Sequence, residues 1–206
     1  QRQMCIRDSA KCLNMRTLLQ RYHRDRPQPD VAAVIERLAW LADRAGRTTR
    51  LSALLGVEGS AAAAYFSVFK QLFKRDWDFP RRVRRPPTDP VNVLLSFGYT
   101  LLTRDLEANV ALVGLDPYLG ALHSTEYGRP SLALDLVEEF RAIVVDSTVL
   151  RALNTEHIRP DDFSPGAGDR PVILSDDGRR RFIQAYEARV GLELRHPVTQ
   201  ERMTLR

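Results

Sequence analysis

Apolar residues recur at intervals of three and four along most of the chain, which is the spacing of the buried face of an α-helix. The first such face begins at Lys11 and stops at the proline-containing segment 26–30. Asp30 is then expected to cap a second helix, and Gly46 to end it. In the first part of the chain the pattern predicts four helices, over residues 11–24, 31–46, 48–55 and 57–74.

Two Asp-Pro pairs mark the starts of predicted helices in the middle of the chain. Asp89-Pro90 supplies an N-cap followed by a proline at the first helical position, and Asp116-Pro117 repeats this sequence before a short helix. Further helices are predicted over residues 91–102, 116–123, 131–152 and 178–191. The fold class is therefore all-α, a multi-helix bundle with one short β element near 172–174 and no internal repeat.

The domain organisation follows from where this pattern begins and weakens. Residues 1–9 show neither a helical nor a strand period, so we expect a non-native or disordered leader there. Residues 10–156 are expected to form one helical domain, and residues 157–206 a loop plus a C-terminal helical extension of that domain.

Composition places the chain among globular proteins, with 44% hydrophobic and 28% charged residues in 206. We find no secretory signal and no run of about 20 uncharged apolar residues, which favours a cytoplasmic protein without a membrane partner. Cys5 and Cys12 are the only cysteines, too few for a disulfide framework or a zinc quartet. Any metal site must therefore take most of its ligands from carboxylates.

The basic residues number 31 against 26 acidic ones, a net charge of +5, and all but three of them are arginines. Arginine binds phosphate through a planar fork, so this excess suits a nucleic-acid-binding protein, although a G+C-rich genome also favours arginine over lysine. Four arginines stand in a segment that two prolines hold extended: Arg81, Arg82, Arg84 and Arg85. We expect them to contact the DNA backbone; the alternative is that some pair with Asp76, Asp78 or Asp89.

Two polar residues interrupt apolar patterns in a way that indicates a site. Glu58 shares a helical stripe with Ala62, Tyr65 and Phe69, where a lone carboxylate is costly unless it is paired or bound to a metal. Glu58 is also expected in the first turn of a helix, where the negative charge of a carboxylate interacts favourably with the helix dipole. His123 ends an apolar run, and such a histidine is either a metal ligand or a structural residue.

Asp135 and Glu138 lie three residues apart, on one face of an apolar helix, where like charges repel. A divalent cation would neutralise them, and so would Arg141, three residues after Glu138, as a structural salt bridge. Together with Glu58 and His123 they form a set of oxygen ligands and one imidazole, which suits Mg²⁺ or Mn²⁺ better than zinc.

Four segments that carry these residues resemble, in the same order, the catalytic domain of the CRISPR-associated integrase family usually called Cas1. The resemblance covers about residues 11–189. Its motifs are Leu55-Gly56-Val57-Glu58-Gly59-Ser60-Ala61-Ala62, Arg84-Arg85-Pro86-Pro87-Thr88-Asp89-Pro90 running into Leu94-Leu95-Ser96-Phe97-Gly98-Tyr99, Gly114-Leu115-Asp116-Pro117 through to His123, and Gly128-Arg129-Pro130 through to Arg141.

The resemblance implies a metal-dependent site. It assigns Glu58, His123 and Glu138 as ligands of Mg²⁺ or Mn²⁺, with Asp135 also needed for catalysis, and Arg129 as a basic residue that binds the scissile-strand phosphate. The implied partners are DNA, as a captured duplex and a CRISPR repeat, a second copy in the full-length homodimer, and a dimer of the small protein Cas2. The β-rich N-terminal domain of the family has no counterpart in this sequence.

The implied function is that of a DNA endonuclease and integrase of prokaryotic antiviral defence. It inserts new spacers when a 3′-hydroxyl attacks a phosphodiester at the edge of a CRISPR repeat; in the nuclease reaction water attacks instead. The alternative is a non-catalytic helical DNA-binding or scaffold module whose acids are salt-bridged to arginines. If Asp135 and Glu138 repel each other without metal, Glu138→Gln is expected to stabilise the metal-free protein slightly.

Overall fold

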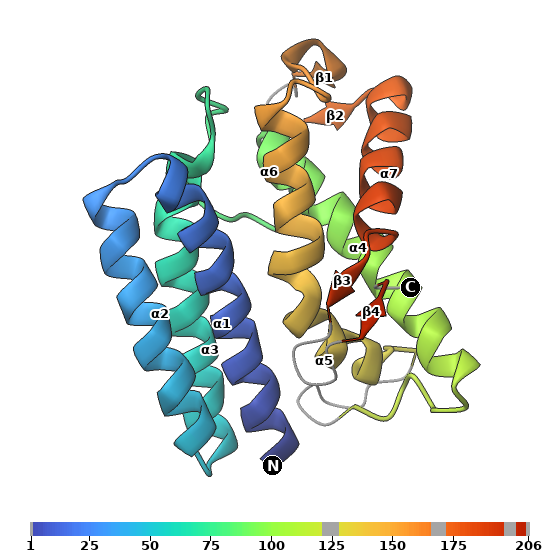
Figure 1. Ribbon diagram of the computed structural model, residues 1–206. Helices are drawn as coiled ribbons and strands as arrows, with labels where there is room; N and C mark the ends of the chain where they lie inside the picture. Colours follow the sequence, from blue (N-terminus) through green and yellow to red (C-terminus); the bar gives the residue numbers. More distant parts are fainter. Residues whose placement is uncertain (1, 121–127, 166–171, 196–200, 205–206) are drawn as a thin grey trace.

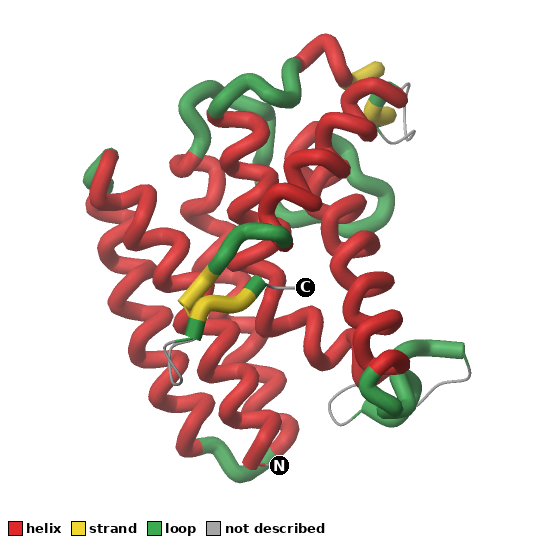
Figure 2. The backbone as a smooth tube through the Cα atoms, turned by 45° about the vertical axis from the view of Figure 1, so that its right-hand side comes forward, coloured by secondary structure: helices red, strands yellow, loops and turns green. Residues whose placement is uncertain are grey.

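The computed structural model describes residues 2–120, 128–165, 172–195 and 201–204. Helices make up most of this part of the chain, which confirms the all-α class (Figure 2). The principal helices are α1 (Arg2–Asp25), α2 (Pro29–Arg47), α3 (Leu51–Phe69), α4 (Pro90–Leu112), α5 (Ser131–Phe140), α6 (Ser147–Asn154) and α7 (Asp176–Val190). Shorter helical segments are the 3₁₀ turns Lys70–Leu72 and Pro160–Asp162 and the π-helical segment Arg141–Asp146.

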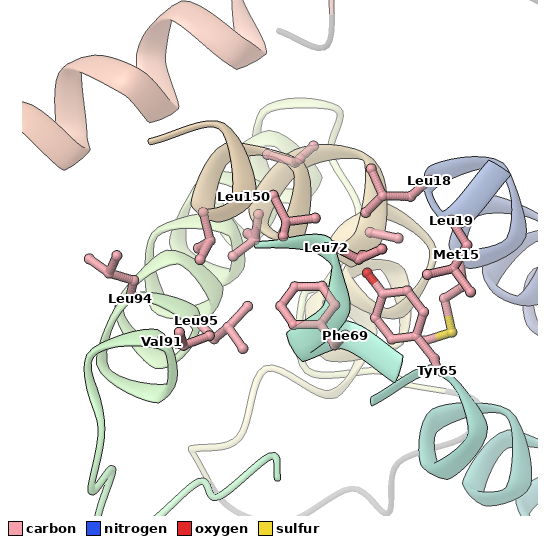
Figure 3. Close-up of a cluster of buried hydrophobic side chains, with 14 of the residues drawn as sticks. Met15, Leu18, Leu19, Tyr65, Phe69, Leu72, Val91, Leu94, Leu95 and Leu150 are labelled. Atoms are coloured by element: carbon pink, nitrogen blue, oxygen red, sulfur yellow. The ribbon is translucent and has the colours of Figure 1, made fainter. Parts of the chain in front are cut away.

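Two groups of helices build the molecule. Helices α1, α2 and α3 lie side by side on the left of Figure 1, and α4, α6 and α7 lie on the right, with α5 below them. The core lies where the groups meet: Figure 3 shows leucines of α1, α4 and α6 gathered around Tyr65 and Phe69 of α3, and both rings are fully buried. The core therefore fixes the position of α3, the helix that also carries Glu58.

Helix α3 is continuous through Gly56, whereas the sequence pattern predicted two helices that meet there. Glycine inside a helix costs about 1 kcal/mol relative to alanine. Buried residues flank the glycine on the same helix, with Leu54 before it and Val57 and Ala61 after it. Their packing outweighs the local propensity, so Gly56 does not end the helix.

The segment Leu51–Leu72 is long and apolar enough to cross a membrane, judged by length and composition, contrary to the expectation from the sequence. In this structure it packs against α1 and α2 within the helical bundle. Its fully buried Tyr65 and Phe69 are typical of a core helix, which passes the same test of length and composition.

The single helix predicted over 131–152 is interrupted by the π-helical segment Arg141–Asp146, which joins α5 to α6. In a π-helix the hydrogen bonds span five residues, so residues five apart lie one turn apart on the same side. Arg141 and Asp146 accordingly line one pocket, described below. A regular α-helix would direct them to different faces.

Two predicted helix starts differ in the structure, and a third is confirmed. Helix α1 begins at Arg2, so the structure places residues 2–9 in the helix that the pattern begins at Lys11. Helix α2 begins at Pro29 with Gln28 as N-cap, and Asp30 lies in its first turn instead of capping it. Helix α4 begins as predicted, because the side chain of Asp89 accepts a hydrogen bond from the backbone N–H of Asn92 at 2.9 Å.

The loop after α4 and the short strands complete the described chain. Of the helix predicted over 116–123, residues 116–120 form turns and the rest lie outside the described residues. The strand predicted near 172–174 is confirmed: β2 (Ile173–Leu174) pairs antiparallel with β1 (Phe163–Ser164). A second small pair, β3 (Leu194–Arg195) with β4 (Arg202–Met203), had no sequence signal.

Candidate metal and nucleic-acid site

Lys11 joins two of the predicted site residues. Its ammonium, on α1, donates a hydrogen bond to Oε1 of Glu58 on α3 at 2.6 Å and another to Oε2 of Glu138 on α5. The Lys11 side chain is only 4% exposed. Because one nitrogen contacts both carboxylates, Glu58 and Glu138 converge on one point from helices that are distant in the sequence.

Glu138 is also bound from its own helix. Arg141 Nη1 lies 2.7 Å from Glu138 Oε1, so the salt bridge considered from the sequence is present. Burial would raise the pKa of Glu138, but the guanidinium of Arg141 and the ammonium of Lys11 outweigh it and hold the pKa below its ordinary value. Glu138 is therefore an ionised carboxylate at neutral pH.

Further acids surround this pair and leave the cluster rich in negative charge. Asp135, one turn before Glu138 on α5, is fully buried. Burial, together with the charges of Glu58, Glu138 and Asp135, raises the pKa of Asp8 to about 7. The Oδ2 atom of Asp8 is buried and has no hydrogen-bond partner in the part of the chain that the structure describes. This charge excess is what a bound cation would relieve.

A pocket of about 630 Å³ opens beside the carboxylates and brings them together with the arginines. The charged residues that line it are Lys11, Glu58, Arg81, Arg82, Arg84, Arg141 and Asp146. The four arginines of this pocket provide binding groups for phosphate, and Glu58 provides an oxygen ligand for a cation next to them.

The arginine run does not act as four equivalent surface charges. Arg82 is half-buried and donates to Asn92 Oδ1 at 2.8 Å and to Ser96 Oγ at 3.1 Å, which fixes the loop to the start of α4. The other three, Arg81, Arg84 and Arg85, are exposed. No ion pair joins any of the four to Asp76, Asp78 or Asp89 among the described residues.

A buried hydrogen-bond network supports the pocket from behind. Asp146 accepts hydrogen bonds from the hydroxyls of Tyr65 at 2.9 Å and Tyr99 at 2.6 Å. The guanidinium of Arg141 lies over the Tyr99 ring, 4.5 Å from its centre, and so contacts both this network and Glu138. Asp146 was not among the residues predicted from the sequence, although an acid within the apolar run 142–150 was a signal for it.

Substituting Asp146 by Asn is expected to change how stability depends on pH. Burial raises the pKa of Asp146 to about 6, against the hydrogen bonds from the two tyrosines, compared with 3.8 in an exposed chain. The protonated form is favoured in the folded state, so the wild type loses roughly 2 kcal/mol of stability as the pH rises from 4 to 7. Asp146→Asn should lack this loss. Urea unfolding of both proteins at each pH measures it, and parallel pH profiles would contradict the assignment.

The other predicted site residues are placed as follows. Glu58 and Glu138 come together, with Asp135 beside them on α5. Arg129 lies two residues before the start of α5 and is half-buried. His123 lies outside the described residues, so its expected contact with the carboxylates stays a prediction. No group of three His, Cys, Asp or Glu side chains in the described part of the chain has the arrangement of a metal site.

The donor set nevertheless fits a hard divalent cation. Carboxylate oxygens are the ligands that Mg²⁺ and Mn²⁺ prefer, and here two of them already share one positively charged partner. Asp8 adds a buried carboxyl oxygen that has no hydrogen-bond partner among the described residues. Glu58 and Glu138 are thus the described residues that would hold the ion.

Fold and site together define a helical protein in which two carboxylates share one lysine beside an arginine-lined pocket. The sequence profile of the family described as CRISPR associated protein Cas1 matches residues 8–188. The chain therefore belongs to the Cas1 family.

Curated relatives agree with this membership. A CRISPR-associated exonuclease Cas4/endonuclease Cas1 fusion from Rhodospirillum rubrum is 44% identical over 213 residues, covering 100% of this chain and 36% of that protein. A CRISPR-associated endonuclease Cas1 from Thermus thermophilus is 43% identical over 171 residues, covering 83% and 51%. The chain thus spans between about a third and a half of the length of these two relatives.

Solved structures share the fold. A Cas1 protein from Thermotoga maritima superposes with a TM-score of 0.76 at 30% identity, covering 91% of this chain and 58% of that one. A chain of a Cas6-RT-Cas1–Cas2 complex gives 0.77 at 28% identity, covering 98% and 22%. A casposase bound to integration product gives 0.81 at 24% identity, covering 98% and 55%, which shows the fold alone.

Proposed function

We propose that this chain carries the catalytic helical domain of a metal-dependent DNA endonuclease and integrase that inserts spacers into a CRISPR array. The relatives named above are called endonucleases, and one structural relative is part of a complex with Cas2. DNA is the substrate in this proposal, with a Cas2 dimer and a second Cas1 copy as partners in the full-length protein.

One observation carries the proposal: Glu58 and Glu138 meet at Lys11, and both Lys11 and Glu58 line a pocket with four arginines, Arg81, Arg82, Arg84 and Arg141. Phosphodiester chemistry needs both a site for a cation and groups that bind the charged phosphate. A scaffold module would need only the charge pairing, and the unpartnered buried oxygen of Asp8 is not explained by such pairing.

Each residue has a distinct task in this proposal. A bound Mg²⁺ or Mn²⁺ would supply Lewis-acid stabilisation of the charge that develops on the phosphate. Glu58, Glu138 and His123 hold the ion, and Asp135 orients or deprotonates the attacking water or 3′-hydroxyl. Arg129 and the exposed arginines of the run bind the DNA backbone and position the scissile phosphate.

The function is tested by cleavage of a labelled branched duplex with Mn²⁺ and with EDTA. We expect cleavage by the wild type only with Mn²⁺, and none by Glu58→Gln, because the amide removes a charged ligand. Glu36→Gln, an exposed glutamate on α2, is the matched control and should cleave as the wild type does. Equal cleavage in EDTA, or by Glu58→Gln, would contradict the proposal.

Replacing Arg84 and Arg85 together by Ala is expected to weaken binding to unrelated DNA sequences about equally. Both side chains are exposed on an extended loop, where they offer charge without the rigid presentation that base reading needs. Each lost phosphate contact should lower the slope of log affinity against log salt by about 0.9. Fluorescence anisotropy over a salt series measures this, and a fall in melting temperature with unchanged affinity would assign both residues to loop structure instead.

A further inference from the structure

A second pocket, of about 780 Å³, lies between α1, α6 and α7 and shares no lining residue with the carboxylate pocket. In Figure 1, α6 stands between α1 and α7, and the pocket is lined from all three helices. Its basic residues are Arg21, Arg151 and Arg189, with His157 three residues after the end of α6. A neighbouring hollow of about 510 Å³ shares Arg21 and Arg189 and adds Arg24, so the two form one elongated basic groove.

The groove has positive charge without a counter-charge. No carboxylate lines either hollow among the described residues. Burial lowers the pKa of Arg189, and the nearby charges of Arg21 and Arg151 lower it further. Arg189 is held in place by a hydrogen bond that its Nε donates to the carbonyl of Ile143 at 2.6 Å. Three mutually repelling guanidiniums, one of them fixed, are an arrangement that binding of an anion would stabilise.

The chemistry of the lining favours nucleic acid over an acidic protein. A protein interface is centred on several large apolar or aromatic anchors, whereas the main pocket offers Tyr22 and Leu192 and otherwise only alanines as its apolar lining. Arginine forks match phosphate oxygens, and an elongated groove suits a chain of regularly spaced charges.

We propose that this groove, defined by Arg21, Arg24, Arg151 and Arg189, binds the phosphodiester backbone of nucleic acid. It is a contact separate from the arginine run near the carboxylates. Arg21 lies ten residues after Lys11 on α1, which is about 15 Å along the helix axis, so one DNA molecule is long enough to reach both sites. The groove binds phosphate whether or not the carboxylates hold a metal. DNA binding by the groove can therefore be tested independently of the proposed cleavage.

The test measures DNA binding in EDTA, so that cleavage does not enter the result. The variant Arg21→Ala/Arg151→Ala changes two exposed side chains, and Arg37→Ala/Arg50→Ala removes the same charge from exposed positions elsewhere. With a 30-base-pair duplex of arbitrary sequence, we expect the groove variant to bind several-fold more weakly than the control variant. Its salt slope should also be lower by about 1 to 2.

The melting temperatures of the two variants show whether both remain folded. Should the double variant melt early, the single variant Arg151→Gln replaces it, with an expected slope reduction of about 1. Equal affinity and equal salt slope in the groove and control variants would overturn the proposal. So would a loss of affinity for polyglutamate as large as the loss for DNA, because the groove would then be a site for an acidic protein.

Discussion

Glu138→Gln is expected to lower the rate of Mn²⁺-dependent cleavage roughly 100- to 1,000-fold. The substitution keeps the shape of the side chain and removes the charge on which Lys11 and Arg141 converge. A cation loses an anionic ligand in the same step. Initial rates on a labelled branched duplex measure the loss, with Glu36→Gln as the control. A fully active Glu138→Gln variant would contradict the catalytic role of Glu138.

The same variant is expected to be less stable than the wild type, by about 3 kcal/mol. The proximity of Asp135 and Glu138 in the sequence alone predicted the opposite sign, through relief of repulsion. The structure reverses this expectation, because Lys11 and Arg141 already neutralise Glu138, and a neutral amide would leave two buried cations under-paired. Metal-free melting curves decide between the two signs.

Lys11→Met is expected to destabilise the metal-free protein by about 3 kcal/mol, which lowers the melting temperature by roughly 10 °C at this chain length. The ammonium is the shared partner of Glu58 and Glu138, and its loss leaves an acidic cluster on partly buried side chains. Mn²⁺ should restore more stability to this variant than to the wild type, since it would replace the missing charge. Thermal melting with and without Mn²⁺ measures both effects.

The chain supplies a matched control, because Lys70 and Lys74 are its only other lysines and both are exposed. Lys74→Met should change the melting temperature little, and Mn²⁺ should affect it as it affects the wild type. If Lys11→Met and Lys74→Met have the same melting temperature, the ammonium of Lys11 does not contribute to the stability of the fold.

Local sequence signals predicted most of the helices and one of the strands. The Asp89-Pro90 start of α4 came out as expected, because the signal and the structure depend on the same few residues. The predicted helix end at Gly56 was wrong. The free-energy cost of glycine in a helix is a local property, whereas the burial of Val57 and Ala61 depends on packing against other helices. The π-helical segment Arg141–Asp146 had no periodic signal, since one additional residue in a turn does not alter an apolar run.

For the site, the sequence identified carboxylates that break apolar patterns, and two of them, Glu58 and Glu138, meet in the structure. Lys11 could not be found in this way, because a lysine near the start of an amphipathic helix is usually a solvated residue. Only the packing of α1 against α3 and α5 places its ammonium between the acids. The role of Arg82 in holding the loop likewise depends on tertiary contacts, the hydrogen bonds to Asn92 and Ser96 of α4.

Anomalous diffraction from crystals soaked in Mn²⁺ tests the metal site, because it locates the ion without reference to activity. We expect one strong anomalous peak in contact with both Glu58 and Glu138, with His123 as a third ligand and the ammonium of Lys11 moved away from the position between the carboxylates. Crystals that bind Mn²⁺ elsewhere, or that keep Lys11 between Glu58 and Glu138 at saturating Mn²⁺ with no peak beside them, would contradict it.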